Sequence, residues 1–517
     1  AFYLYVNGQQ VGYAEDSYTS DEFNITSYLR TGENTIAVEV YRWSTGSYLE
    51  NQDFIRYSGI FRDVNLYSKN QVEVRDVFIK TELDDAYKDA TLELDASIRN
   101  LGDAAAAGKT YQVKADLYEI DGKTKVWDSP LEIAVNVPQA KATVEEKSDD
   151  VGVTVTGSKA VKNPKKWFAD TPNLYLLLIE LKDDTGYVVE TLCQRVGFRE
   201  IGKVDINENG QEQAQINGKK IMFRGTNRHE SDHIDGRAIT KEDIKEDLFL
   251  MKEFNVNAIR MSHYPNNPYT YALADELGLY ICDETNVESH IGASSNHIPS
   301  GYPVWNNSVM DRTKNMVERD KNHPSVVIWS LGNEATYQVY EKNENYCFWN
   351  STQWILQRDP SRLRKYERDN RYTKGNREDS IVDIYSSQYW GVSSVEGHVS
   401  NPANKAPYIQ SEYAHAMGNG LGNFKEYWDV FRSYPNGQGG FIWDWIDQSL
   451  LTKADDSDEM FFGYGGDWGE TVHDRDFCAN GLVNADRTPS PELYEVKKVH
   501  QEVSFYDDGA AANGQVR

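Results

Sequence analysis

The stretch Val326-Val327-Ile328-Trp329-Ser330-Leu331, followed at once by Gly332-Asn333-Glu334, sets the pattern of the C-terminal part of the chain. A short apolar run that ends abruptly in polar residues is typical of a strand buried in a parallel sheet. Further runs of this kind follow Asn217-Gly218, with helical patterns between them. Eight strand–helix units in about 300 residues predict a (β/α)8 TIM barrel. The runs are Ile221–Gly225, Ala258–Met261, Leu279–Cys282, Val326–Leu331, Leu363–Tyr366, Ile381–Tyr385, Tyr408–Gln410 and Gly440–Ile442; polar residues interrupt the fifth and sixth.

One of the intervening stretches, Lys241–Asn255, shows the helical pattern clearly. Thr240 and Asp243 have the spacing of a capping box at its start. Its apolar residues recur every three or four positions, as on one face of a helix. These residues are Ile244, Leu248, Met251 and Phe254.

The N-terminal part of the chain reads as all-β. Phe2-Tyr3-Leu4-Tyr5-Val6 runs into Asn7-Gly8, which favours a hairpin, and Thr35–Tyr41 alternates like a half-buried strand. A second β segment covers roughly 69–200, with alternating strands over Thr91–Ala96 and Tyr111–Leu117. The length of this segment suits one β-sandwich.

Composition excludes several classes of protein. The 517 residues carry 54 Lys and Arg against 81 Asp and Glu, a net charge of −27, which phosphate backbones would repel. We therefore expect no nucleic-acid partner. No stretch approaches the roughly 18–20 apolar residues that a membrane span needs, so none is expected. The four cysteines show no C-x-x-C spacing, which argues against a disulfide framework or a cysteine zinc site.

Acids, histidines and aromatics follow almost every predicted barrel strand. In a (β/α)8 barrel the active site lies at the carboxyl ends of the strands, so these residues should line it. They are Asn227–Glu230, Ser262–Tyr264, Asp283–Asn286 with Glu288 and His290, Gly332–Glu334, Gln388–Trp390, Ser411–His415 and Trp443–Trp445.

Two of these residues, Glu334 and Glu412, suggest a reaction. They end the fourth and seventh strands, which face each other across the mouth of an eight-stranded barrel. Hydrolysis of a glycosidic bond needs two carboxyl groups, one to protonate the leaving oxygen and one to attack or to activate water. Each could instead be a solvated loop residue or an ion-pair partner, but Trp329, Tyr413 and Trp443 flank them.

Longer motifs resemble glycoside hydrolase family 2, and within it the lac-type β-galactosidases. The Ala414-His415-Ala416-Met417 run favours galactosidases over the glucuronidases and mannosidases of that family. The resemblance implies a partial jelly-roll β-sandwich, an immunoglobulin-like β-sandwich and a catalytic TIM barrel. The matching motifs are Phe223–Glu230, Met261–Pro265, Trp329–Glu334, Ser411–Asn419, Tyr48–Asp53, Ser58–Val64 and Phe477–Val483.

By this resemblance Glu412 is the nucleophile and Glu334 the general acid/base of a retaining double displacement. The substrate would be a β-galactoside such as lactose, cleaved at its terminal non-reducing galactose. Asn333 resembles a contact to the sugar 2-hydroxyl, and Tyr389 the tyrosine beside the nucleophile. The other substrate-binding residues that the resemblance implies are Asp53, His229, His263, His415 and Trp443.

The resemblance also implies two ions. Glu288, His290 and Glu334 match magnesium ligands, and carboxylates with one imidazole suit Mg²⁺, for which we expect Mn²⁺ to substitute. Asp53, the Phe477 carbonyl and Asn480 match a sodium site that meets the galactose 6-hydroxyl.

The implied domains are the C-terminal part of a jelly-roll sugar-binding domain over 1–68, the immunoglobulin-like sandwich over 69–200, the barrel over 201–505 and a linker to a missing C-terminal domain over 506–517. The chain opens at Ala1-Phe2-Tyr3 without Met or signal peptide, and family members carry more chain on both sides. The resemblance allows a homo-oligomer for the full-length protein.

Three other functions deserve comparison. His229-Glu230-Ser231-Asp232-His233 fits the H-E-x-x-H motif of zinc proteases, which requires a helix, yet here it follows a strand and enters a loop-like stretch. A non-catalytic carbohydrate-binding protein would suit the aromatics and β segments but would not need both Glu334 and Glu412. A family relative acting on another β-glycoside also stays open.

Overall fold

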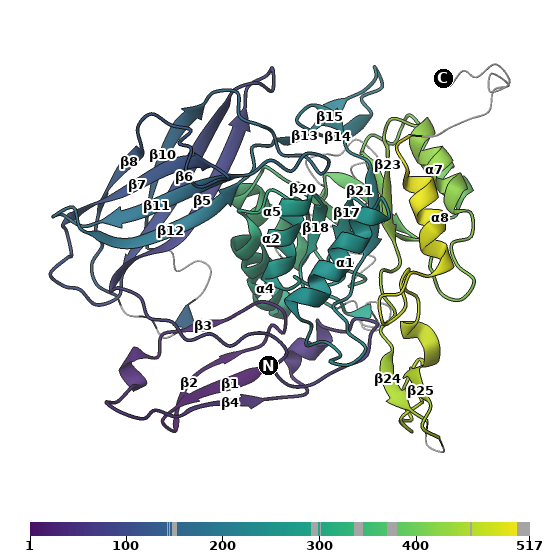
Figure 1. Ribbon diagram of the computed structural model, residues 1–517, viewed down its shortest axis with the longest axis horizontal. Helices are drawn as coiled ribbons and strands as arrows, with labels where there is room; N and C mark the ends of the chain where they lie inside the picture. The colour runs from purple at the N-terminus through teal and green to yellow at the C-terminus, as the bar shows by residue number, and fades with distance from the viewer. Residues whose placement is uncertain are drawn as a thin grey trace.

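The computed structural model describes residues 1–141, 143, 145–146, 152–290, 298–299, 301–335, 345–369, 380–454 and 457–503. It contains a small N-terminal sheet, a β-sandwich and a closed barrel of parallel strands (Figure 1). The predicted linker over 506–517 lies outside the described residues. No helix within the described part of the chain has the length and apolar character to cross a membrane.

The N-terminal sheet is antiparallel, with the order β2-β1-β4. Its first two strands form the predicted hairpin, in which Asn7 and Gly8 both have positive φ (52° and 80°), the backbone of a type I′ turn. A short strand, β3, pairs with β9 of the following domain. The elements are β1 Phe2–Val6, β2 Gln9–Ala14, β3 Glu22–Phe23, η1 Thr26–Tyr28, β4 Ile36–Val40, η2 Thr45–Tyr48 and β9 Glu145–Glu146.

The immunoglobulin-like sandwich consists of two antiparallel sheets, β10-β6-β5 and β12-β11-β7-β8. Inward side chains alternate with partly exposed ones, most regularly along β11, and the inward ones form the sandwich core. The strands are β5 Val72–Leu83, β6 Ala90–Asn100, β7 Thr110–Glu119, β8 Leu131–Asn136, β10 Val153–Val161, β11 Tyr175–Lys182 and β12 Val188–Val196.

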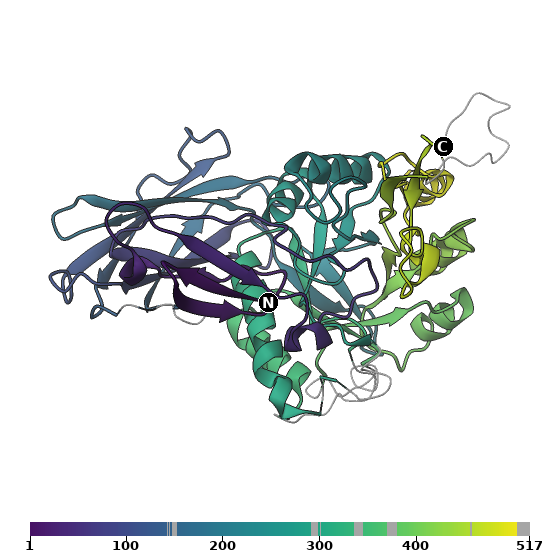
Figure 2. The ribbon, with the colours of Figure 1, turned by 90° about the horizontal axis from the view of Figure 1, so that it is seen from below.

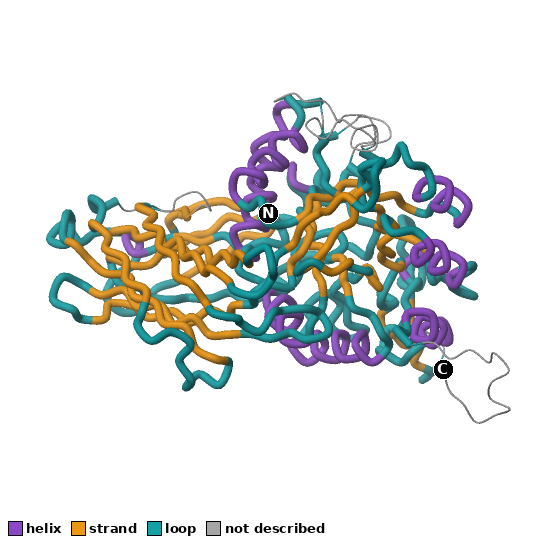
Figure 3. Tube along the Cα trace, turned by 90° about the horizontal axis from the view of Figure 1, so that it is seen from above, coloured by secondary structure: helices purple, strands orange, loops and turns teal. Residues whose placement is uncertain are grey.

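The barrel closes through eight parallel strands, β16 to β23 in chain order, which confirms the predicted TIM barrel. The α-helices surround this half of the molecule, while the half that holds the sandwich consists mainly of strands and loops (Figure 3). The strands are β16 Phe223–Asn227, β17 Ala258–Arg260, β18 Tyr280–Glu284, β19 Val326–Ser330, β20 Leu363–Glu367, β21 Ile384–Gln388, β22 Tyr408–Tyr413 and β23 Gly437–Ile442. The helices are α1 Lys241–Glu253, α2 Pro268–Leu277, α4 Asn306–Asp320, α5 Cys347–Arg358, α6 Val392–Val399, α7 Phe424–Ser433 and α8 Pro491–His500, with η3 Pro303–Trp305 before α4.

Three barrel strands start later than their apolar runs, the third strand by one residue only, at Tyr280 rather than Leu279. The first begins at Phe223 rather than Ile221, and the sixth at Ile384 rather than Ile381. Ile221 is buried outside the strand, in the apolar cluster that closes the amino-terminal end of the barrel. Burial at a barrel end therefore produces the same apolar signal as a strand.

Helix α1 has the expected form. The Thr240 side chain accepts from the backbone N–H of Asp243, and the Asp243 side chain accepts from that of Thr240, which completes the predicted capping box. Ile244, Leu248 and Met251 are buried against the barrel. The predicted spacing of apolar residues therefore identified the face of α1 that packs against the barrel.

Two small sheets flank the barrel. The hairpins β13 Ile201–Asp205, β14 Glu212–Ile216 and β15 Lys219–Lys220 lead into its first strand, and β24 Leu450–Lys453 with β25 Met460–Gly463 follows its last, before η5 Arg475–Cys478. The N-terminal sheet lies alongside the sandwich and reaches the barrel (Figures 1 and 2).

Candidate active site

The side chains predicted to line the barrel mouth do gather at the carboxyl ends of its strands. Glu412 is near the end of β22, Asn333 and Glu334 follow β19, and Trp443 follows β23. The H-E-x-x-H stretch at 229–233 is a loop rather than a helix, so it lacks the geometry of a zinc protease.

Glu412 is buried and held by three donors. Arg260 Nη1 donates to its Oε1 at 2.7 Å and Gln388 Nε2 to the same oxygen at 3.0 Å, while the Tyr389 hydroxyl also donates to the carboxylate. Burial alone would raise the pKa of Glu412, but the charges of Arg260 and His263, together with the hydrogen bonds from Arg260 and Tyr389, outweigh it and lower the pKa. Glu412 is therefore ionised at neutral pH.

Glu334 has the opposite character. Burial raises its pKa to about 8, and the negative charge of Glu412 adds to the increase. His290 Nε2 lies 3.1 Å from its Oε2 and opposes the increase only in part. At neutral pH one carboxyl group of the pair is protonated and the other is not, which is the division that acid catalysis with a nucleophile requires.

The turn that carries Glu334 is tight. Gly332 has a φ of +145°, and a Cβ there would lie 2.7 Å from the carbonyl oxygen of Val287. Glu334 itself has a φ of +33°, a region that residues other than glycine rarely adopt. Its side chain direction thus depends on a backbone that its surroundings hold in place.

Asn333 joins the hydrogen-bond network of Glu412. Its Oδ1 accepts from Arg260 Nη2 at 2.8 Å and from Gln388 Nε2 at 3.0 Å. Its Nδ2 lies 3.4 Å from His263 Nε2. The same two donors therefore fix Asn333 and Glu412 relative to each other.

Trp443 forms an aromatic wall with two histidines. The His263 ring stacks on it with centroids 5.1 Å apart and an interplanar angle of 8°, and the His229 ring meets it edge-on at 5.4 Å. Burial lowers the pKa of both histidines, and the neighbouring cations lower it further. His229 Nε2 is buried without a hydrogen-bond partner in the described structure, which suits a neutral ligand for a sugar hydroxyl.

Tyr389 and His415 form a second side of the mouth. Their rings are 6.1 Å apart, and the His415 ring is 5.9 Å from that of Phe477. Burial, followed by the charge of Glu412, raises the pKa of Tyr389, so its hydroxyl stays protonated and can donate.

Glu288 and His290 lie together as predicted, and Asp53 from the N-terminal part joins them. One ligand atom from each of the three lies within 4.8 Å of the others. His290 contacts Asp53 at 3.2 Å through Nδ1 and Glu334 through Nε2. Burial and the neighbouring carboxylates raise the pKa of Glu288, whose Oε2 has no hydrogen bond to any described residue. This set of oxygens with one imidazole fits a hard divalent cation.

The other predicted ion ligands are only partly together. Asn480 Nδ2 donates to the Phe477 carbonyl at 2.9 Å, and Asn480 Oδ1 is buried without a partner in the described residues. Asp53, expected beside them, instead contacts His290.

The N-terminal part reaches the site through main-chain pairing. Glu288 N–H donates to the Leu49 carbonyl at 2.7 Å, and Asn51 N–H donates to the Glu288 carbonyl at 2.9 Å. Asn333 N–H donates to the Val287 carbonyl at 3.0 Å. We call this three-segment arrangement the mouth ladder.

The buried Asn286 side chain reinforces the mouth ladder. Its Nδ2 donates to Asp16 at 2.7 Å and to Glu50 at 3.0 Å, and its Oδ1 accepts from Gln52 Nε2 at 2.8 Å. One barrel residue thus holds three residues of the N-terminal part.

Arg260 was not predicted among the site residues, whereas Glu284 and Gln388 belong to strand-end stretches that were. Arg260 and Gln388 bind Glu412 directly, and Glu284 binds Arg260. A signal existed for Arg260, because it is a charged residue inside the apolar run Ala258–Met261, and a charge in a buried strand needs a partner.

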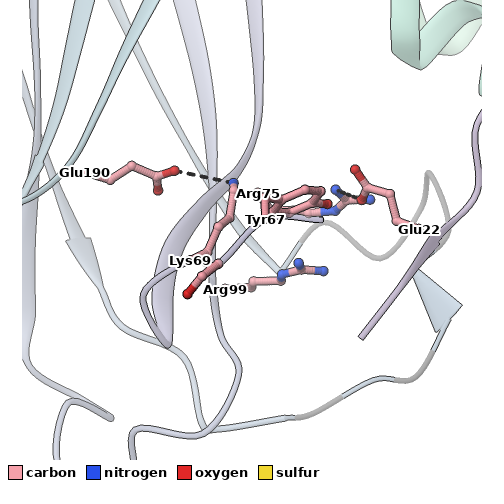
Figure 4. Close-up of a pocket in the computed structure, with 7 residues that line it drawn as sticks. Glu22, Tyr67, Lys69, Arg75, Arg99 and Glu190 are labelled. Atoms are coloured by element: carbon pink, nitrogen blue, oxygen red, sulfur yellow. Dashed lines mark hydrogen bonds and ion pairs between the residues drawn. The ribbon is translucent and has the colours of Figure 1, made fainter. Parts of the chain in front are cut away.

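A pocket of about 440 Å³ lies away from the barrel strands (Figure 4). Its lining comes from the segment that precedes β5, from strands β5, β6 and β12, and from Glu22. Two ion pairs lie among these residues, Lys69 with Glu190 and Arg75 with Glu22. No residue lining it belongs to the barrel, so it is not part of the site described above. Its lining residues are Glu22, Tyr67, Ser68, Lys69, Arg75, Arg99 and Glu190.

Known proteins resemble this chain along its length. A beta-galactosidase of Priestia megaterium is 45% identical over 513 residues, which are 98% of this chain and 46% of that protein. One of Pseudoalteromonas haloplanktis is 43% identical over 515 residues, again 98% and 46%. The chain therefore spans less than half the length of these curated relatives.

Solved structures share the fold. A Bacteroides uniformis beta-glucuronidase superposes with a TM-score of 0.72 at 23% identity, covering 98% of this chain and 60% of that one. A putative beta-galactosidase from Bacteroides fragilis gives 0.72 at 20% identity, covering 97% and 73%.

Three models of one family match in succession. The sugar binding domain of glycosyl hydrolases family 2 matches residues 1–70, the central family 2 model matches 72–199, and the TIM barrel domain matches 207–505. With these matches, the eight-stranded barrel and relatives more than 40% identical across it, the chain belongs to glycoside hydrolase family 2.

Proposed function

We propose that the chain carries the catalytic site of a retaining β-galactosidase that removes terminal non-reducing β-D-galactose from β-galactosides such as lactose. The observation that carries the proposal is the carboxyl pair, in which the pKa of Glu334 is raised to about 8 and that of Glu412 is lowered. The beta-galactosidase names of the relatives support the choice of sugar.

In the first step, the Glu412 carboxylate attacks the anomeric carbon. The bond from that carbon to the aglycone oxygen breaks, and Glu334 gives its proton to the departing oxygen. The product is a covalent galactosyl ester on Glu412 and a free alcohol or sugar.

In the second step, Glu334 is ionised and accepts a proton from water. The water oxygen bonds to the anomeric carbon, the ester bond to Glu412 breaks, and galactose leaves with its β configuration. The Arg260 guanidinium, 2.7 Å from Glu412, stabilises the carboxylate before attack and on release.

The remaining mouth residues would hold the sugar. We assign Asn333 to the 2-hydroxyl, Trp443 to stacking on a sugar face, and His229 to a hydroxyl through its unpartnered Nε2. His263, Tyr389, His415 and Asp53 complete the proposed set.

We also propose two ions. Glu288 and His290, with Glu334 and with Asp53 beside them, would hold Mg²⁺ or Mn²⁺, whose positive charge would orient Glu334 and adjust its acidity. The Phe477 carbonyl and Asn480 would hold Na⁺ near the galactose 6-hydroxyl, and Asp53 would join them only by leaving its contact with His290.

Two alternatives predict different results. A non-catalytic carbohydrate-binding protein would bind galactosides without cleaving them, and a relative acting on another β-glycoside would prefer a different sugar. Purified protein is assayed with p-nitrophenyl β-D-galactoside, β-D-glucuronide and β-D-mannoside. We expect the galactoside to be cleaved fastest and released as β-galactose by NMR. Binding without cleavage, preference for another sugar or initial release of α-galactose would each contradict the proposal.

A further inference from the structure

Four charged side chains link the backbone of Glu334 to the carboxylate of Glu412 beneath the barrel mouth. All four have no exposed surface, and their charges alternate. We call them the buried charge row: Glu367, Lys365, Glu284 and Arg260.

The row begins at the turn that carries the acid. Glu367 Oε1 accepts the backbone N–H of Glu334 at 2.7 Å. Glu367 ends β20, the strand next to β19, so it approaches the turn from the side. Glu334 has the positive φ described above, and this charge-assisted hydrogen bond holds its peptide in that unusual orientation.

Cations fix the two carboxylates inside the row. Lys365 Nζ lies 3.4 Å from Glu284 Oε2 and 4.0 Å from Glu367 Oε2. Arg260 donates to both oxygens of Glu284, at 2.8 and 2.9 Å. Each buried carboxylate thus has a cation beside it, as a carboxylate without solvent requires.

The row ends at the nucleophile. Arg260, which pairs with Glu284, also donates to Glu412 at 2.7 Å. The acid's backbone and the nucleophile's carboxylate are therefore anchored to the same set of side chains from β17, β18 and β20.

We propose that Glu367 is a positioning residue, which holds the Glu334 backbone so that its carboxyl group reaches the leaving oxygen. Lys365, 4.0 Å from Glu367, supplies the neighbouring positive charge. This inference rests on the acid role of Glu334 in the proposed function. Because Glu367 acts only through the acid, its loss should matter most where the leaving group needs a proton.

The test compares two galactosides in the first chemical step, which kcat/KM reports. Lactose has a poor leaving group that needs protonation, whereas 2,4-dinitrophenyl galactoside does not. Glu367→Met removes the acceptor, and we expect kcat/KM to fall about 10- to 100-fold for lactose but less than about threefold for the dinitrophenyl substrate. Glu367→Gln keeps an oxygen acceptor without the charge and should give a smaller difference in the same direction.

The matched control is Glu73→Gln in the sandwich. Glu73 is equally withdrawn from solvent and bonded to Arg99, but it lies outside the barrel. We expect the ratio between the two substrates to stay at the wild-type value in this variant. Thermal unfolding of each variant shows that it is folded at the assay temperature.

Equal losses on both substrates in Glu367→Met would overturn the inference, since a general loss of structure predicts them. If that variant does not fold, Glu367→Gln decides, and a wild-type ratio there overturns the inference. If the wild-type protein cleaves another β-glycoside instead, the proposed sugar is wrong, and the same comparison of leaving groups in that series judges Glu367 separately.

Discussion

Arg260 and Glu412 form an ion pair of 2.7 Å in which the arginine has no exposed surface and the carboxylate almost none. The same guanidinium reaches Glu284 and Asn333, so one side chain lowers the pKa and fixes the direction of the proposed nucleophile. A planar guanidinium can bridge these groups, whereas an ammonium group cannot reach all of them.

Arg260→Lys should therefore slow the attack itself. We expect kcat/KM to fall about 100-fold for lactose and for dinitrophenyl galactoside alike, because both need the same nucleophile. Steady-state kinetics on the two substrates measure this. A loss confined to lactose would assign Arg260 to acid catalysis instead.

The roles of the two glutamates separate under substitution. Glu412→Gln should abolish turnover of every galactoside, since no nucleophile remains. Glu334→Gln should impair lactose far more than activated aryl galactosides, and added azide should partly restore turnover and yield β-galactosyl azide. Formation of the α-linked azide would show that the mechanism inverts or that the roles are reversed.

The alkaline limb of the pH profile should report Glu334. Its pKa of about 8 means that the proton is present at neutral pH and is lost as the pH rises. In EDTA, kcat/KM for lactose should fall about tenfold per pH unit above about pH 8. The matched variant Glu334→Gln, assayed with dinitrophenyl galactoside, should lack this limb. An unchanged limb would assign it to another group.

The proposed divalent cation can be tested without an activity assay. Mn²⁺ binding, measured by electron paramagnetic resonance of the free ion, should be lost in Glu288→Gln, which removes the most buried carboxylate of the group. Treatment with EDTA should lower activity without abolishing it, and Mg²⁺ should restore it. Equal Mn²⁺ binding by the variant and the wild type would contradict the assignment.

One ion pair should control acid stability. Burial alone would raise the pKa of Asp383, but Arg364, 2.7 Å away, with Lys203 lowers it to about 2. The pair stabilises the folded state above the unfolded pKa of 3.8, and this contribution disappears as the pH falls toward 2. Asp383→Asn should lower the free energy of unfolding by about 2 kcal/mol at pH 7. Urea unfolding should show the difference shrinking below about pH 4; a constant difference would contradict it.

The sequence predicted the barrel well because its strands are buried on both faces. Runs such as Val326–Leu331 have no other plausible structure, and the polar residue after each run marks the mouth. Arg364 and Lys365 interrupt the fifth run and Asp383 the sixth. Arg364 pairs with Asp383, and Lys365 pairs with Glu284 in a polar barrel interior.

That interior explains what the sequence did not predict. The buried charge row depends on partners from strands far apart in the chain, such as Arg260 with Glu412. Local patterns carry no information on such pairs. The contact of Asp53 with His290 likewise depends on how two domains meet.

The mouth ladder makes residues 49–53 structurally part of the barrel, although they precede it by more than a whole sandwich domain. Recombination between relatives that exchanged the N-terminal domain alone would place a segment from another protein against Glu288 and Asn333. Such chimeras should keep the folds of both domains, but the main-chain pairing of the mouth ladder should be disturbed. A chimera is therefore expected to stay active only when Leu49 to Asp53 and Asn286 come from the same parent. The segment that must be inherited together is thus the interface between the two domains rather than either domain alone.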